Sequence, residues 1–224
     1  MKLYMHPVSM TSRPVRLFVA DQMISVEEEV VDIMSGEHLK EPYILLNPNG
    51  LVPMLTDGSL RLTESATILR YLADRIGSTA YPHDLHQRAR VNEVMDWLNT
   101  QFYRDWGYGL CYPQFLPNHK RRSNEANAGT IEWSLNQSRK WIQILNDRLI
   151  GPSKPYLCGE RITIADYLGA GLVTVGEVVG MDFANYGNVR RWLNNMKQSP
   201  NWAQTNKEFY ELVDAMKGRQ FKTL

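Results

Sequence analysis

The sequence contains 224 residues, of which 43% are hydrophobic and 22% are charged, as is typical of a globular protein that forms one large or two ordinary domains. Its 25 basic and 24 acidic residues leave a net charge of +1, which argues against binding nucleic acid or a membrane surface through bulk charge. The two cysteines, Cys111 and Cys158, offer neither a disulfide framework nor a metal-binding spacing, and without a signal peptide or a long apolar run the expected location is a reducing cytoplasm.

The N-terminal third of the chain alternates strand and helix signals. In chain order the pattern predicts a strand at 2–5, a helix at 12–23, a strand at 26–31, a hairpin at 52–56 and 60–63, and a helix at 65–75. Ser12 is the predicted N-cap of the first helix, with Pro14 in its first turn. Asp57-Gly58 is typical of a tight hairpin turn. This order predicts a small α/β domain.

The composition changes after Gly77, and strand signals nearly vanish beyond it. The change predicts a first domain at 1–77, a linker at 78–86 and an all-helical domain at 87–224. Predicted helices of the second domain occupy 85–108, 124–149, 189–196 and 202–216. Thr163 and Asp166 are spaced as a capping box at the start of a further helix, which gives both a structural role.

Two short motifs of the first domain present backbone groups that suit a peptide. Pro53 stands at the entry to a strand, where a cis Val52-Pro53 bond would turn the N–H and C=O of Val52 outward to pair with a bound peptide. The helix that begins at Glu64-Ser65 offers unpaired N–H groups to a carboxylate, and Glu64 offers its own carboxylate to an ammonium. Together these motifs predict a site for a small zwitterionic peptide.

These motifs, in this order and with the Thr163–Asp166 box, resemble those of the cytosolic glutathione transferases over essentially the whole chain. The segment from Tyr4 to Arg13 is similar to the serine-using theta and delta classes, and residues 29–32 and 47–50 are similar to bacterial theta-like members. The resemblance implies a thioredoxin-like N-terminal domain with a mixed four-stranded sheet, followed by an all-helical bundle domain.

The resemblance identifies Ser9 as the catalytic residue, since these classes carry a serine in the loop between the first strand and helix. A glutathione thiol is mostly protonated at pH 7, and only the thiolate is a good nucleophile. Lowering its pKa by about two units requires roughly 2.7 kcal/mol, which a donated hydrogen bond and a nearby helix N-terminus can supply. Ser12 and Tyr4 are the rival hydroxyls, and a simple cap of the loop is the alternative role for Ser9.

The remaining contacts to glutathione also follow from the resemblance. Glu64 would take the γ-glutamyl ammonium and Ser65 its carboxylate, while Val52, positioned by Pro53, would pair with the cysteinyl residue. His38 matches a histidine near the glycyl carboxylate, although a plain loop histidine is the alternative. The cationic residues that relatives often carry at 50, 51 or 66 are missing from this sequence, so the glycyl end of the peptide is under-provided.

The second substrate is expected over Ser9, against aromatic residues of the helical domain. The predicted electrophile pocket consists of Tyr103, Arg104, Trp106, Tyr108, Tyr112 and Phe115. Such a wall suits a flat or apolar electrophile, and Arg104 would suit one with a negative group. Core packing is the alternative role for much of this cluster.

The resemblance implies a glutathione transferase that joins the glutathione thiolate to a small electrophile, with glutathione as cosubstrate, no metal, no other bound cofactor, and a homodimeric assembly. Two alternatives stay open on the residues alone. One is a glutathione-dependent dehalogenase on the same scaffold, and the other is a non-catalytic glutathione-binding or interaction protein.

Overall fold

Four short strands form one mixed sheet in the computed structural model, which describes residues 1–224. They are β1 (Lys2–Met5), β2 (Glu27–Val30), β3 (Met54–Asp57) and β4 (Leu60–Leu62). The sheet order is β2-β1-β3-β4, with β1 parallel to β2 and antiparallel to β3, and with β3 and β4 joined as the predicted hairpin. The predicted mixed four-stranded sheet is thus confirmed.

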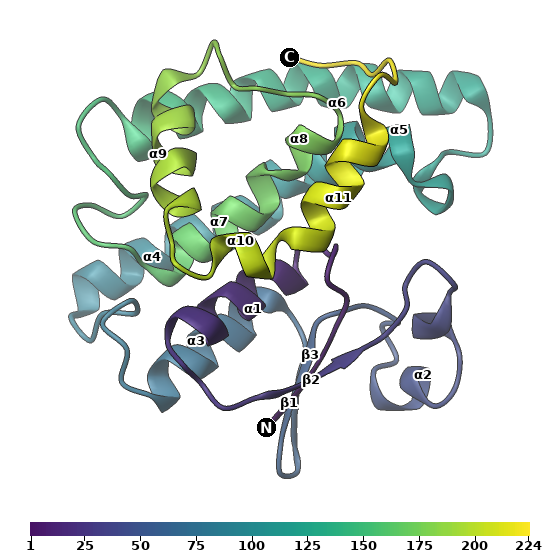
Figure 1. Ribbon diagram of the computed structural model, residues 1–224. Coiled ribbons are helices and arrows are strands. Elements are labelled where there is room, and N and C mark those ends of the chain that lie inside the picture. The colour runs from purple at the N-terminus through teal and green to yellow at the C-terminus, as the bar shows by residue number, and fades with distance from the viewer.

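Alternation along β1 and β3 directs side chains to two separate cores, because successive strand residues point to opposite faces. Leu3, Met5 and Leu55 belong to the large core, whereas Met54 joins a small cluster against which Tyr4 packs. The helices α1 (Ser12–Asp21) and α3 (Ser65–Arg75) cover the first face. The short η1 (Glu37–Leu39) and α2 (Tyr43–Leu46) lie on the other side of the sheet (Figure 1).

Edge strand β2 keeps its acidic residues in solvent. Glu27 and Glu29 both pair with Lys2 of the neighbouring strand, and Glu28 on the opposite face pairs with Arg16 of α1. Charged side chains on an exposed edge oppose unwanted pairing with another chain.

The chain beyond Leu85 forms no further strand and is helical, as predicted. Its elements are α4 (Leu85–Trp97), η2 (Leu98–Phe102), η3 (Arg104–Cys111), α5 (Tyr112–Phe115), η4 (Pro117–His119), α6 (Asn124–Ile144), η5 (Leu145–Ile150), α7 (Ile164–Val173), α8 (Val175–Val178), α9 (Gly187–Lys197), α10 (Trp202–Thr205) and α11 (Lys207–Met216). The helix predicted at 85–108 therefore continues to Phe115, and its segments η2 and η3 are π-helical.

Helix α7 starts at the predicted capping box of Thr163 and Asp166, which is confirmed. The buried carboxylate of Asp166 accepts hydrogen bonds from the N–H groups of Thr163 and Leu157 and from the indole of Trp192. Burial raises the pKa of Asp166 and these donors oppose the rise. The box thereby ties the loop before α7 to α9.

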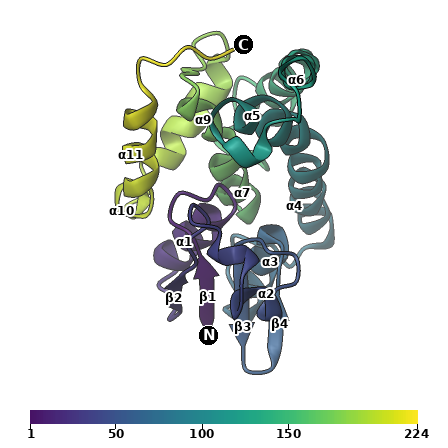
Figure 2. The same cartoon turned by 90° about the vertical axis from the view of Figure 1, so that its right-hand side faces the viewer.

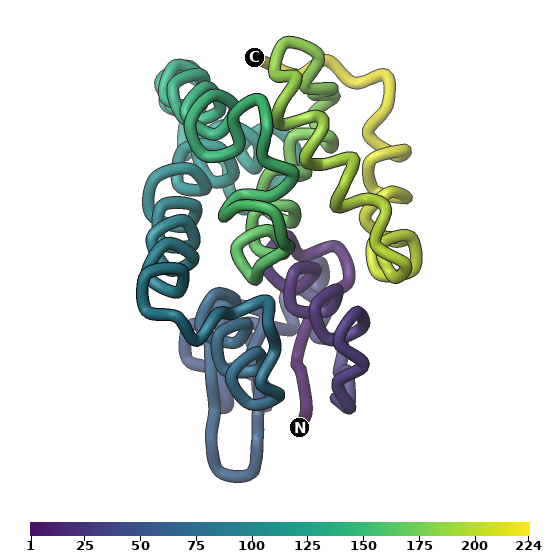
Figure 3. The backbone as a smooth tube through the Cα atoms, turned by 90° about the vertical axis from the view of Figure 1, so that its left-hand side faces the viewer, coloured from purple at the N-terminus to yellow at the C-terminus, as the bar shows by residue number.

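Helix α7 packs against α1, and the two lie side by side in both turned views (Figures 2 and 3). Gly171 permits the approach, since a Cβ there would lie 2.3 Å from Pro14 Cγ. Arg13 fills the same interface at 1% exposure, with uncharged partners. Its guanidinium donates to Asn206 Oδ1 at 2.6 Å and to Thr174 Oγ1 at 3.0 Å, and burial lowers its pKa to about 10.

Two X-Pro peptide bonds are cis, Glu41-Pro42 and Val52-Pro53. The second was predicted from its place at the strand entry and the first was not. None of the helices combines the length and the apolar composition that a membrane span requires.

Candidate functional site

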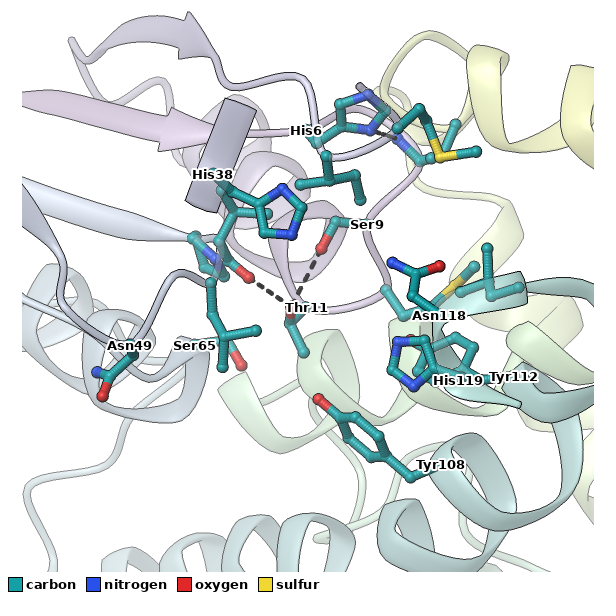
Figure 4. A pocket seen from close by; sticks show the side chains of 18 of the residues that line it. His6, Ser9, Thr11, His38, Asn49, Ser65, Tyr108, Tyr112, Asn118 and His119 are labelled. Carbon is teal, nitrogen blue, oxygen red and sulfur yellow. Dashed lines mark hydrogen bonds between the residues drawn. The ribbon is translucent and has the colours of Figure 1, made fainter. Parts of the chain in front are cut away.

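A cavity of about 910 Å³ lies between the loops of the sheet domain and the helices beyond them. Its N-terminal wall includes His6, Ser9, Thr11, His38, Asn49, Val52, Pro53, Glu64 and Ser65. Its helical wall includes Tyr103, Tyr108, Tyr112, Phe115, Asn118, His119, Leu212 and Met216. Figure 4 shows Ser9 and Thr11 facing Tyr108 and His119 across this space.

Ser9 lies in the loop between β1 and α1 and lines the cavity. Its Oγ accepts a hydrogen bond from the N–H of Ser12 at 3.2 Å, and its carbonyl accepts one from the N–H of Arg13. Ser9 therefore caps the N-terminus of α1, where the helix presents positive potential. Ser9 therefore both caps the helix and lines the cavity, two roles that the sequence left as alternatives.

Neither rival hydroxyl lines the cavity. Ser12 is fully buried and its Oγ accepts from the N–H of His6, so the prediction that Ser12 caps α1 is wrong. The reason is that Ser12 already lies within the helix, where its side chain points inward. Tyr4 packs on Tyr43 beneath the sheet.

Thr11 was not singled out from the sequence, yet it joins two parts of the N-terminal wall. Its hydroxyl donates to the carbonyl of Val52 at 2.9 Å and lies 3.1 Å from Ser9 Oγ (Figure 4). The loop before α1 is thereby held against the entry to β3. The contact between residues 11 and 52 gives Thr11 this role, and sequence patterns do not reveal such a contact.

Val52 and Pro53 line the cavity through a segment that is fixed from behind. The carbonyl of Leu51 accepts hydrogen bonds from Tyr43 Oη at 2.6 Å and from Asn47 Nδ2 at 2.7 Å. The backbone that faces the cavity is therefore held by the buried polar side chains of α2 and its end. Such support limits the rearrangement needed when a ligand pairs with this backbone.

Glu64 and Ser65 lie where the cavity meets the N-terminus of α3. Glu64 is exposed and has a φ of +65°, a conformation that is costly for a residue other than glycine. Ser65 is 5% exposed and begins the helix. The pair combines a carboxylate with the unpaired N–H groups of a helix start, as predicted.

Histidines supply the only basic side chains among the residues that line the cavity, and Glu64 supplies the only carboxylate. His38 Nδ1 is buried without a hydrogen-bond partner. Half-burial lowers the pKa of His6, which nearby Asp32 opposes, and burial together with Arg121 lowers the pKa of His119. His6 and His119 belong to opposite walls, and neither was identified from the sequence.

The helical wall consists of aromatic rings packed edge to face. Ring centroids of Tyr103 and Tyr108 lie 5.2 Å apart, those of Tyr108 and Tyr112 lie 5.3 Å apart, and the His119 ring lies 4.9 Å from that of Tyr112. Burial raises the pKa of Tyr103, Tyr108 and Tyr112. The three phenols are therefore neutral near pH 7. Tyr103, Tyr108, Tyr112 and Phe115 line the cavity where the sequence predicted an electrophile pocket.

Two predicted members of that pocket lie elsewhere, and their inclusion was wrong. Trp106 is fully buried in the core, where its indole N–H donates to the carbonyl of Val173 at 3.2 Å. Arg104 is exposed and pairs with Asp105 at 3.0 Å. The helix turns both side chains away from the cavity, so no arginine is available there for an anionic electrophile.

No cluster of three or more His, Cys, Asp or Glu side chains is arranged to hold a metal ion. The residues that line the cavity offer hydroxyl groups, histidines, one carboxylate, backbone groups and aromatic rings.

Residues 1–74 match the family described as the glutathione S-transferase N-terminal domain, and residues 113–200 match the glutathione S-transferase C-terminal domain. Human glutathione S-transferase theta-1 is 32% identical over 173 residues, which cover 74% of this chain and 69% of the human protein.

Solved structures give the same result. A delta-class glutathione transferase from Nilaparvata lugens superimposes with a TM-score of 0.78 at 27% identity, covering 96% of this chain and 99% of the insect chain. The apo form of human glutathione S-transferase T1-1 superimposes with a TM-score of 0.78 at 26% identity, covering 95% and 90% of the two chains.

Proposed function

The chain belongs to the glutathione transferase family, and from that premise we propose that Ser9 activates glutathione for attack on a small aromatic or apolar electrophile. As a member of this family it is an enzyme that uses glutathione as its cosubstrate. In this proposal the N-terminal wall of the cavity binds glutathione and the helical wall binds the electrophile. The place of Ser9 in the cavity, at the N-terminus of α1, carries the proposal.

The Ser9 hydroxyl donates a hydrogen bond to the sulfur and stabilises the thiolate. Two features support this role: the hydroxyl already accepts from the Ser12 N–H, and it lies beside the positive end of α1. A hydrogen bond to a charged acceptor is stronger than a neutral one. The thiol proton leaves to water, because Ser9 keeps its own proton and acts as a donor and not as a base. The thiolate then attacks the electrophilic carbon.

The N-terminal wall binds the peptide along its length. The N–H groups at the start of α3 and the Ser65 hydroxyl bind the γ-glutamyl carboxylate, and Glu64 binds the ammonium. Val52, preceding Pro53, pairs with the cysteinyl residue through its backbone. His38 binds the glycyl carboxylate, and its place among the few basic side chains that line the cavity supports this role.

The helical wall binds the electrophile against Tyr103, Tyr108, Tyr112 and Phe115. Its rings suit flat or apolar substrates, and the exposed position of Arg104 removes the reason to expect a negative group on them. The Tyr108 phenol, which lines the cavity and is partly exposed, offers a hydrogen-bond donor.

Three further features belong to the same proposal. Residues 1–77 form the glutathione-binding domain, 78–86 the linker and 87–224 the domain that binds the electrophile. The enzyme is a homodimer, which light scattering after gel filtration tests directly. It acts in the cytoplasm.

The proposal is tested by the ultraviolet difference spectrum of the glutathione thiolate, measured on the wild type and on Ser9→Ala across a pH series. We expect the bound thiol to titrate about two units higher in the variant, while glutathione still binds through the α3 site. A thiolate signal unchanged by Ser9→Ala would remove Ser9 from the mechanism. A matched control is Ser35→Ala, which alters an exposed hydroxyl at the mouth of the same cavity.

A further inference from the structure

Thr11 is hydrogen-bonded to both groups to which the proposed function assigns the cysteinyl residue of glutathione. Its hydroxyl donates to the carbonyl oxygen of Val52 at 2.9 Å, and its Oγ1 lies 3.1 Å from Ser9 Oγ. Figure 4 shows two dashed hydrogen bonds that leave the Thr11 hydroxyl, one of them to Ser9. The side chain is partly buried and lines the cavity itself.

A count of protons fixes the direction of this short chain of bonds. A hydroxyl group carries one proton, and that of Thr11 is used on the Val52 carbonyl. The bond between the two hydroxyls must therefore use the proton of Ser9. In this arrangement Ser9 accepts from the Ser12 N–H and donates to Thr11, so its single proton is not available to a sulfur.

We propose that Thr11 is a positioning residue that couples the binding of the cysteinyl amide at Val52 to the direction in which Ser9 donates. The inference rests on the proposed function of Ser9 and Val52. When the cysteinyl N–H donates to the Val52 carbonyl, that carbonyl stays hydrogen-bonded even if the Thr11 hydroxyl turns to donate to Ser9 Oγ, so the turn no longer leaves it unpaired. Ser9 then donates to the sulfur. Two hydroxyl groups rotate, each keeps its proton, and the thiol proton leaves to water.

The oxygen separation gives the reason for the rotation. Once Ser9 donates to sulfur, no proton would lie between two oxygen atoms 3.1 Å apart unless Thr11 turned toward Ser9. After the turn, Ser9 Oγ accepts from Ser12 and from Thr11 while it donates to sulfur. A hydroxyl that accepts hydrogen bonds is polarised and becomes a stronger donor. The thiolate is thus stabilised fully only when the peptide backbone is seated.

The first test compares the pKa of the bound glutathione thiol in the wild type, Thr11→Val and Thr11→Ser, measured by the thiolate difference spectrum. Thr11→Val removes the hydroxyl, and we expect the thiol pKa to rise by about 0.5–1 unit, the weight of one hydrogen bond. Below that pKa the turnover rate falls by the corresponding factor of about three to ten. Thr11→Ser keeps the hydroxyl and restores the wild-type pKa.

A merely structural role for Thr11 would give a different result, with a changed melting temperature or glutathione affinity and an unchanged thiol pKa. That result for Thr11→Val overturns the proposal, and so does a failure of Thr11→Ser to restore the pKa. The proposed function stands in either case if Ser9→Ala still raises the thiol pKa. If Ser9→Ala leaves the thiol pKa unchanged, both the proposed function and the role of Thr11 are contradicted.

The second test leaves the protein unaltered and therefore does not depend on how the variants fold. The probe is a glutathione analogue in which the amide between the γ-glutamyl and cysteinyl residues is replaced by an ester, so that no N–H reaches the Val52 carbonyl. Its bound thiol pKa is compared with that of the same thiol in solution. We expect a smaller lowering of the pKa than for glutathione on the wild type, and no difference between the two peptides on Thr11→Val. An equal lowering for both peptides on the wild type contradicts the coupling.

Discussion

The N-terminal wall of the cavity is held by directed hydrogen bonds, whereas the helical wall is held by rings packed on one another. Thr11, Tyr43 and Asn47 each donate to a backbone carbonyl of residues 51 or 52. Across the cavity, Tyr103, Tyr108, Tyr112 and His119 make contacts with one another at centroid distances of 4.9–6.0 Å.

The difference matches what each wall is proposed to bind. Hydrogen bonds fix both the distance and the direction of a partner, so the N-terminal wall suits one peptide that never changes. Aromatic packing fixes shape and polarity only loosely, which suits the flat or apolar electrophiles proposed for the helical wall. Under the proposed function, the cosubstrate is therefore fixed by one wall and the electrophile is selected by the other.

The largest test of the comparison is Ser65→Ala. Loss of a hydrogen bond to the charged γ-glutamyl carboxylate should raise the Kd for glutathione by about 10- to 100-fold, as measured by calorimetry. The KM for the electrophile at saturating glutathione should stay within about twofold. Thr67→Ala, an exposed position on the same helix, is the matched control and should leave both constants unchanged. Equal effects on both constants would show that the walls do not act separately.

Tyr108→Ala is the reciprocal change on the helical wall. Tyr108 is 42% exposed, so its truncation should leave the fold intact. Loss of ring contacts should raise the KM for an aromatic electrophile by about two- to tenfold, while the Kd for glutathione stays constant. Tyr108→Phe keeps the ring and should resemble the wild type for substrates without a hydrogen-bond acceptor. A loss of equal size in Tyr108→Phe would show that the hydroxyl, and not the ring, binds them.

Acidification should destabilise the folded protein through one histidine on each wall. Burial lowers the pKa of His6 on one wall and of His119 on the other, so the folded protein favours the neutral rings. The stability they contribute is therefore present above the unfolded pKa of about 6.5 and is lost as the pH falls toward the lower folded values. We expect the melting temperature to fall between about pH 7 and 5. The fall should be shallower in His6→Gln and in His119→Gln, and an unchanged slope in both would contradict this assignment.

The smallest expected effect is that of Arg104→Ala. Its side chain is exposed and paired with Asp105, outside the cavity. Values of kcat and KM for neutral and for anionic electrophiles should change by less than about twofold, as for most exposed ion pairs. A selective loss with anionic electrophiles would return Arg104 to the pocket.

Features of the site that depend on neighbouring residues in the sequence were predictable. The Val52-Pro53 entry, the Glu64-Ser65 helix start and the Thr163–Asp166 box each carry a local signal, and each is present. Ser9 was found through a family pattern and not through its chemistry alone. Thr11 was missed because Val52, the partner that joins it to the entry of β3, lies 41 residues away.

The aromatic cluster shows why the rest could not be predicted. An α-helix brings residues three or four apart onto one face, which groups Tyr103 with Trp106. The segment Arg104–Cys111 is π-helical, and hydrogen bonds between residues five apart give it a wider turn. Tyr103 and Tyr108 therefore share a face, and Trp106 points into the core. No feature of the sequence signalled this change of pitch.

The interface at Arg13 bears on how hybrid enzymes of this family could be assembled. Arg13 belongs to the half that carries Ser9, but it donates to Gly171, Thr174 and Asn206 of the other half. Gly171 also leaves the space that Pro14 occupies. A hybrid joined after residue 77 would take these positions from two different parents. The buried guanidinium of Arg13 would then lose its matched hydrogen-bond partners. The two parent enzymes must therefore carry compatible residues at 13, 14, 171, 174 and 206. Compatibility at this interface, and not the choice of linker, decides whether two such domains can be combined.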